Sequence, residues 1–249
     1  MENLFSMRKS KNLRIAISLF GLGVVGIASL LWVSPPTLPP GLKMDPSTVR
    51  WATLVNPTLL LIISITIGTL LKDSAGIRLP ILDAKKDKPM LSVFQDLLHP
   101  LLVLTAISSL GVMVIYLGTC WGFDPAFKEV IKGPGLPVWT RVLYGGITEE
   151  ILMRYGLMTM LLWILKEFNR PNSHIQFWIA NILTAMLFAT GHLPALFNEV
   201  FSPSIWTLVY ILGGNFWAGL CFGFAFWRFG LILAILTHMG FHLITYFIF

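Results

Sequence analysis

Hydrophobic positions along the chain fall into long blocks, separated by short segments rich in polar residues, proline or glycine. The blocks approach the roughly 20 residues that an α-helix needs to cross a bilayer. The first block is longer than a signal-peptide core and is not followed by a small-residue cleavage site, so we expect a retained helix. We expect Pro194 to end the fifth helix, because proline interrupts helical hydrogen bonding. The pattern predicts seven membrane-spanning helices, over residues 13–33, 52–71, 100–121, 138–165, 177–193, 205–227 and 231–249.

The composition supports this interpretation. Hydrophobic residues make up 55% of the chain and charged residues 12%, whereas soluble domains average about 45–50% and about 25%. We therefore expect an all-α polytopic membrane helix bundle with about seven transmembrane helices, and eight as the alternative count.

The net charge of +6 could indicate nucleic-acid binding, but the positions of the basic residues explain it better. They gather in the N-terminal arm, residues 1–14, and in the charged loop 72–95. With seven helices, 12 Lys and Arg residues lie on the side of the N-terminus and 5 on the other side. The positive-inside rule then predicts an integral, multi-pass protein with a cytoplasmic N-terminus and no nucleic-acid partner.

Three charged residues interrupt the middle of the fourth apolar block: Glu149, Glu150 and Arg154. Each costs about 2.5–3.5 kcal/mol at the centre of a membrane helix, so we expect them to face the protein interior or water. Glu150 and Arg154 are four residues apart and can pair on one helical face. Glu149 has no basic residue at i+3 or i+4 and is expected to remain free. The alternative is a buried ion network that only fixes helix packing.

Three histidines also lie in apolar helices. His238 and His242 are four residues apart, which places both imidazoles on one helical face. His192 closes the fifth helix. At 1.5 Å per residue, Glu149 lies about 12 Å along its helix from Arg141, so one carboxylate and three imidazoles can meet at a similar depth. The alternative for each histidine is a core side chain bonded to a backbone carbonyl.

These residues form ordered motifs: Glu149-Glu150-x-x-x-Arg154, Phe188-x-x-x-His192, Arg228-Phe229-Gly230-Leu231 and His238-x-x-x-His242. In this order they resemble the CPBP (Abi) family, which includes CAAX prenyl endopeptidases and proteins associated with bacteriocin processing or immunity. The resemblance covers residues 138–249, which we interpret as the catalytic helical core. Residues 1–137 then form an N-terminal arm and three helices with loops.

The resemblance implies an intramembrane endopeptidase. Its substrate would be a membrane-associated peptide or lipidated protein, of a prenylated CAAX type or a leader type. By position, Glu149 and His192 would activate water, and His238 and His242 would stabilise the oxyanion.

The resemblance also implies that Arg154 orients Glu150 and that this pair holds the geometry of the site. Phe188 is expected to serve packing. The last motif, His238-x-x-x-His242, departs from the family, which has Asn or Asp where this chain has His242. A neutral imidazole can still donate one hydrogen bond, so an oxyanion role survives.

No cofactor is expected, but the departure leaves a zinc mechanism open. His192, His238, His242 and Glu149 together offer the nitrogen and oxygen ligands that Zn²⁺ accepts. The sequence has no His-Glu-x-x-His motif to support such a site. Histidines in two helices could also ligate a b-type haem, which is a weaker alternative.

Two further classes of function remain open at this point. A catalytically inactive scaffold or immunity-type binding protein would keep the fold without the activity, and His242 motivates that alternative. A transporter or proton relay also uses carboxylates and histidines inside the membrane. In all three cases the lipid bilayer is a partner.

Overall fold

The computed structural model describes residues 2–34, 44–79, 90–132, 135–168 and 173–248, and these ranges contain helices and no strand. Part of the predicted charged loop 72–95 lies outside them. The helices are α1 (Glu2–Ser29), η1 (Leu30–Trp32), α2 (Pro46–Ala52), α3 (Val55–Ala75), α5 (Met90–Thr119), η2 (Cys120–Gly122), α6 (Pro125–Lys132), α7 (Val138–Thr140), η3 (Arg141–Glu149), η4 (Ile151–Met158), α8 (Thr159–Phe168), α9 (Ser173–Thr190), α10 (Leu193–Glu199), α11 (Ile205–Phe229) and α12 (Leu231–Ile248).

Six of the described segments are long and apolar enough to cross a membrane: Ser10–Trp32, Pro46–Ala75, Gln95–Gly122, His174–Glu199, Ile205–Phe229 and Leu231–Ile248. They confirm the all-α polytopic bundle and an integral, multi-pass membrane protein. The predicted span 138–165 falls in a helical run from Val138 to Phe168, which we call the acidic helix. Its charged residues lower its hydropathy, and π turns interrupt its α-helix, so the count of seven stays a prediction.

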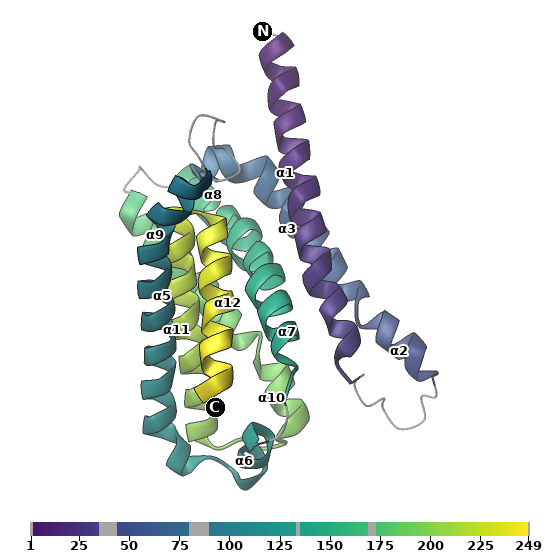
Figure 1. Ribbon diagram of the computed structural model, residues 1–249, viewed down its shortest axis with the longest axis vertical. Helices are drawn as coiled ribbons and strands as arrows, with labels where there is room; N and C mark the ends of the chain where they lie inside the picture. The colour runs from purple at the N-terminus through teal and green to yellow at the C-terminus, as the bar shows by residue number, and fades with distance from the viewer. Residues whose placement is uncertain (1, 35–43, 80–89, 133–134, 169–172, 249) are drawn as a thin grey trace.

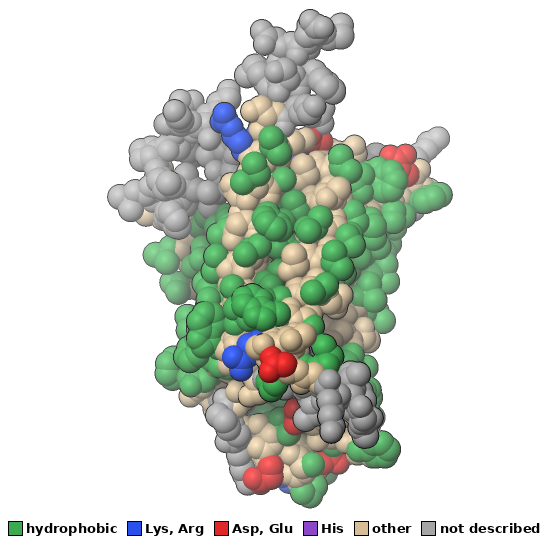
Figure 2. Space-filling model, turned by 90° about the vertical axis from the view of Figure 1, so that its right-hand side faces the viewer, with side chains coloured by type: hydrophobic (Ala, Val, Ile, Leu, Met, Phe, Trp, Pro, Cys, Tyr) green, Lys and Arg blue, Asp and Glu red, His purple; other side chains and the backbone are tan. Residues whose placement is uncertain are grey.

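The surface of the molecule agrees with a membrane location. Figure 2 shows hydrophobic side chains over the middle of one face, while the Lys, Arg, Asp and Glu side chains lie mostly toward its ends. Large apolar side chains such as Leu59, Leu102, Val114 and Leu187 are exposed. In water this surface would be unfavourable, whereas lipid tails accept it.

The acidic helix packs between two groups of helices (Figure 1). Its η3 segment contacts α12 and α1, and its η4 segment contacts α3. On the side of α12, the helices α5, α9 and α11 complete the bundle, with α11 packed against the other three. The most polar of the long helices is therefore covered by other helices.

Helix α1 approaches the acidic helix closely. The hydroxyl of Thr148 donates a hydrogen bond to the carbonyl oxygen of Gly23 over 2.9 Å. The hydroxyl of Thr140 donates to the carbonyl oxygen of Ser29 over 3.0 Å. A Cβ atom at Gly26 would lie 2.1 Å from the Thr148 hydroxyl oxygen. Small residues thus allow the two helices to touch through backbone and hydroxyl groups, as in other membrane helix pairs.

The largest apolar core draws on both predicted domains. Completely buried members include Leu19 of α1, Leu61 of α3, Ile151 and Tyr155 of η4, and Leu233 of α12. The division of the chain at residue 138 stays a prediction.

Candidate active site

Three of the motifs, those of Glu150, Phe188 and His238, come together around a buried carboxylate. The Glu150 side chain is completely buried, and its Oε2 lies 3.3 Å from Nε of the equally buried Arg154. Its other oxygen, Oε1, lies 3.0 Å from Nδ1 of His238 on α12. The predicted Glu150–Arg154 pair is therefore confirmed. The contact with His238 was not predicted, because it joins residues 88 positions apart on different helices.

His238 is held in a fixed orientation. Its ring stacks on Phe222 on one side, with ring centroids 4.1 Å apart, and on His242 on the other, with centroids 4.6 Å apart. Only 1% of His238 is exposed, whereas His242 is half-buried. The stacking confirms that the two imidazoles share one helical face.

Phe188 connects the second motif to the other two. Its ring centroid lies 4.8 Å from that of His192 and 5.9 Å from that of His238. The guanidinium carbon of Arg154 lies 5.6 Å from the same ring, a distance typical of a cation–π contact. Phe188 thus serves packing, as expected, at the point where the three motifs meet.

His192 lies at the turn between α9 and α10 and is half-buried. Its Nδ1 lies 2.8 Å from the carbonyl oxygen of Phe188. A carbonyl oxygen only accepts hydrogen bonds, so Nδ1 carries the proton and Nε2 of the neutral ring holds a lone pair. The alternative of a core histidine expects a hydrogen bond to a backbone carbonyl, and His192 makes this bond through Nδ1. The other ring nitrogen, Nε2, takes no part in it and is available for other chemistry.

Glu149 is half-buried and interacts electrostatically with His192, Glu150 and Arg154. In the part of the chain that the structure describes, no hydrogen bond or ion pair joins its carboxylate to another side chain. The two adjacent glutamates therefore differ, as their spacing from Arg154 predicted. Glu150 is fixed by two partners, and Glu149 is free.

The backbone of the acidic helix is unusual where these glutamates lie. The segments η3 (Arg141–Glu149) and η4 (Ile151–Met158) are π-helical, with Glu150 between them. π turns are rare and often occur at functional sites. They are also wider and shorter than α-helical turns, so the spacing of about 12 Å expected between Arg141 and Glu149 is an upper limit.

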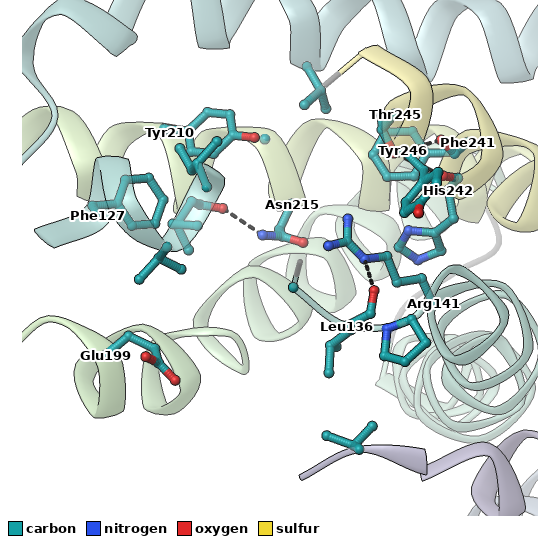
Figure 3. Close-up of a pocket in the computed structure, with 18 of the residues that line it drawn as sticks. Phe127, Leu136, Arg141, Glu199, Tyr210, Asn215, Phe241, His242, Thr245 and Tyr246 are labelled. Atoms are coloured by element: carbon teal, nitrogen blue, oxygen red, sulfur yellow. Dashed lines mark hydrogen bonds between the residues drawn. The ribbon is translucent and has the colours of Figure 1, made fainter. Parts of the chain in front are cut away.

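A cavity of about 960 Å³ opens beside this site (Figure 3). Its wall combines the end of η1 and the two residues after it, one residue of α5, α6, the start of η3, the first half of α11 and the last turns of α12. Of the predicted site residues in the described ranges, His242 lines it. Arg141, Tyr210, Asn215 and Tyr246 also face it, as Figure 3 shows.

The described residues contain no group of three or more His, Cys, Asp or Glu side chains placed to hold a metal ion. The zinc alternative, with Glu149, His192, His238 and His242 as ligands, therefore gains no support from the side-chain geometry. The metal-free mechanism and the zinc mechanism both stay predictions.

Comparison with known proteins agrees with the motifs. Residues 133–244 match the model of the family described as "Type II CAAX prenyl endopeptidase Rce1-like". No curated protein and no solved structure shows a significant match to the chain. The matched residues include all of the predicted site residues, and the resemblance to CPBP proteins is confirmed. The match indicates a CAAX-protease-like membrane endopeptidase in general terms. The similarity to the type II CAAX prenyl endopeptidase Rce1-like family therefore covers residues 133–244 of this chain.

Proposed function

We propose that this chain is an intramembrane endopeptidase in which Glu149 and His192 activate the attacking water. The observation that carries the proposal is the meeting of three motifs around Phe188, with Glu149 left free beside the Glu150–Arg154 pair. A carboxylate without a fixed partner can accept a proton during the reaction, whereas the two oxygens of Glu150 already contact Arg154 and His238.

In the proposed reaction, Glu149 takes a proton from a water molecule as the water oxygen adds to the scissile carbonyl carbon. His192 orients the same water through Nε2, because its Nδ1 is bonded to the Phe188 carbonyl. The tetrahedral intermediate then collapses and the C–N bond breaks. The proton on Glu149 passes to the leaving amine, so both products are released without any other reactant.

His242 would donate one hydrogen bond to the negative oxygen of the intermediate, as a neutral imidazole can. His238, whose Nδ1 contacts Glu150, would hold the His242 ring in place by stacking against it. This gives Glu150 a role as a positioning residue, and it explains why the arginine and the histidine contact different oxygens of one carboxylate.

The substrate class follows from the family and the surroundings of the site. We expect a peptide or lipidated protein at the membrane, either a prenylated CAAX-type or a leader-type sequence. The apolar, lipid-facing surface around the bundle is compatible with a substrate that arrives through the bilayer.

A second candidate is an inactive scaffold or immunity-type binding protein with the same fold. The observation that favours it is His242, which stands where the family has Asn or Asp. This candidate predicts that Glu149 and His192 can be replaced without effect on the cellular role of the protein.

One experiment separates the two candidates even while the substrate is unidentified. New protein termini in the host membrane proteome are compared between wild type and Glu149→Gln at matched expression, with the exposed Glu167→Gln on α8 as the control. We expect termini that are present with wild type and Glu167→Gln and absent with Glu149→Gln. Identical termini in all three strains, with folded proteins, would overturn the protease proposal.

A further inference from the structure

Helices α1 and α3 lie on one side of the acidic helix, away from α5, α9, α11 and α12 (Figure 1). We call them the N-terminal helix pair. They pack against each other, and a Cβ atom at Gly23 of α1 would lie 2.5 Å from Cδ1 of the buried Leu61 of α3. In the described ranges, their main contacts with the rest of the bundle are with the acidic helix. The pair therefore affects the other helices mainly through the acidic helix.

The first contact of this pair holds the residue before Glu149. Thr148 is completely buried, and its hydroxyl donates a hydrogen bond to the carbonyl oxygen of Gly23 on α1 over 2.9 Å. A Cβ atom at Gly26 would overlap with the Thr148 hydroxyl and with the carbonyl oxygen of Leu143, so the close approach needs glycine there. A hydrogen bond between membrane helices contributes only about 0.6 kcal/mol on average. Its main effect here is to fix a position.

The second contact holds the residue after Arg154. Tyr155 is completely buried in η4, and its hydroxyl oxygen lies 3.0 Å from Oγ1 of Thr69 on α3. The backbone and ring of Tyr155 cover Gly68, where a Cβ atom would overlap with both. Arg154 itself pairs with Glu150 in the buried site. Two adjacent residues of η4 are thus held by different parts of the molecule.

These contacts lie on both sides of the free carboxylate in the chain. The residue before Glu149 is bonded to α1, and the residue after it, Glu150, contacts Arg154 and His238. Together they fix the rotation of the acidic helix about its axis, and hence the direction of the Glu149 side chain. A π-helix is rare and mostly limited to a single turn, so segments as long as η3 and η4 need support from packing. The N-terminal helix pair gives this support along both segments.

We propose that the N-terminal helix pair controls the candidate active site by setting the rotation of the acidic helix, with Thr148 as the positioning residue for Glu149. While α1 and α3 are packed in place, Glu149 is held where it interacts electrostatically with His192. Once they move away, the acidic helix turns and water activation is lost without unfolding of the bundle. The inference names the regulation of the same site, and it rests on the proposed function for the effect on cleavage.

The test compares two bonds between the same two helices. Thr148→Val and Thr140→Val each remove a buried hydroxyl that donates to a carbonyl oxygen of α1, over 2.9 and 3.0 Å, and only Thr148 is next to a glutamate. The full chain is placed in phosphatidylcholine nanodiscs with a farnesylated peptide of CAAX type. We expect Thr148→Val to lower kcat about 10- to 100-fold at almost unchanged KM, because small misplacements of a catalytic group have effects of this size. Thr140→Val should lower kcat less than about threefold at a similar melting temperature, and Thr148→Ser, which keeps the hydroxyl, should retain the wild-type kcat.

A second measurement does not depend on cleavage. Nitrogen NMR signals of the imidazole rings are recorded for the same proteins with isotope-labelled histidine. Because Glu149 interacts electrostatically with His192, a turn of the acidic helix changes the surroundings of that ring. We expect the His192 signal to shift in Thr148→Val and to keep its wild-type position in Thr140→Val.

Tyr155→Phe tests the second contact, and it replaces the first variant if that protein does not fold. It removes the hydroxyl that meets Thr69, and it should shift the ring signal of His238, which contacts the acidic helix through Glu150. Thr66→Val on α3 is the matched control. The Thr66 side chain is exposed, and its hydroxyl bonds to the backbone of its own helix, so its replacement should leave the signal in place.

A wild-type kcat for Thr148→Val, or equal losses of kcat for Thr148→Val and Thr140→Val, would overturn the inference, because the bond would then serve packing alone. Unchanged ring signals in the folded Thr148→Val and Tyr155→Phe proteins would overturn it as well. Failure of the proposed function has a different signature. The protein termini in host membranes would then be identical for wild type and Glu149→Gln, while the ring signals would still shift as expected.

Discussion

The two adjacent glutamates should respond in opposite ways to the same replacement. Glu150→Gln keeps the shape of the side chain and removes its charge, which leaves the buried Arg154 without its counter-ion. Glu149→Gln removes a charge that has no fixed partner in the described structure. We expect Glu150→Gln to destabilise the fold and Glu149→Gln to abolish cleavage at almost unchanged stability.

The size of the effect can be worked out from the contacts. Removal of one partner from a buried ion pair costs about 3–5 kcal/mol. The Arg154–Glu150 distance of 3.3 Å is longer than the roughly 2.7–2.9 Å of a strong charge-assisted bond, which favours the lower end. We therefore expect about 3 kcal/mol for Glu150→Gln, or roughly 6–12 °C in melting temperature for a chain of this size. Glu149→Gln should cost less than about 1 kcal/mol.

The assay is thermal unfolding of the purified proteins in one detergent, followed by circular dichroism, together with cleavage of a demonstrated substrate below the lower melting temperature. The double replacement Glu150→Leu with Arg154→Met serves as a second check, because an apolar pair of similar volume often restores stability. Equal losses of stability for Glu149→Gln and Glu150→Gln, or none for Glu150→Gln, would refute the assignment of a free and a paired carboxylate.

Two further replacements test the surroundings of the site. Gly145→Ala would bring a Cβ atom to 2.5 Å from the His242 ring. Because the ring can move away, we expect little loss of stability but at least a tenfold lower kcat/KM. Unchanged kinetics would contradict a role for His242. Asp124 accepts hydrogen bonds from the Ser204 backbone N–H and the Thr207 hydroxyl, each over 2.8 Å, and these bonds lower the pKa of its carboxyl. Its stabilising effect should be present above the unfolded pKa of about 3.9 and should be lost as the pH falls through the lower folded value. Because solvent screens this carboxylate, Asp124→Asn should lower the stability by at most about 1 kcal/mol near pH 7. The melting temperatures of wild type and Asp124→Asn should converge in acid, and a difference that stays constant with pH would contradict this.

Where the sequence signal is local, the expectations agree with the structure. The last two helices, expected over residues 205–227 and 231–249, are observed at Ile205–Phe229 and Leu231–Ile248. Gly230 separates them with a φ angle of +92°, so a single residue marks both boundaries. The Glu150–Arg154 pair was also predictable, because a spacing of four residues fixes it within one helix.

Other features depend on information that no local pattern contains. The prediction that Pro194 ends the fifth helix was wrong. Helix α9 already ends at Thr190, and Pro194 lies in the first turn of the next helix, α10. Proline fits that position because its missing N–H is not needed there. The π turns of the acidic helix and the Glu150–His238 contact arise from packing between helices, and hydrophobic periodicity does not report either of them.

The close contact between α1 and η3 bears on how the protein is made. Because α1 precedes the acidic helix in the chain, the carbonyl groups of Gly23 and Ser29 are synthesised before the threonines that donate hydrogen bonds to them. The family-matched domain therefore obtains part of its hydrogen bonding from a helix outside its own boundaries. A fragment that starts at residue 133 lacks α1, so the surface that α1 covers would face lipid. Addition of α1 as a separate peptide should cover this surface again. The N-terminal helix is thus part of the packing surface of the acidic helix, and a fragment without it lacks two hydrogen bonds.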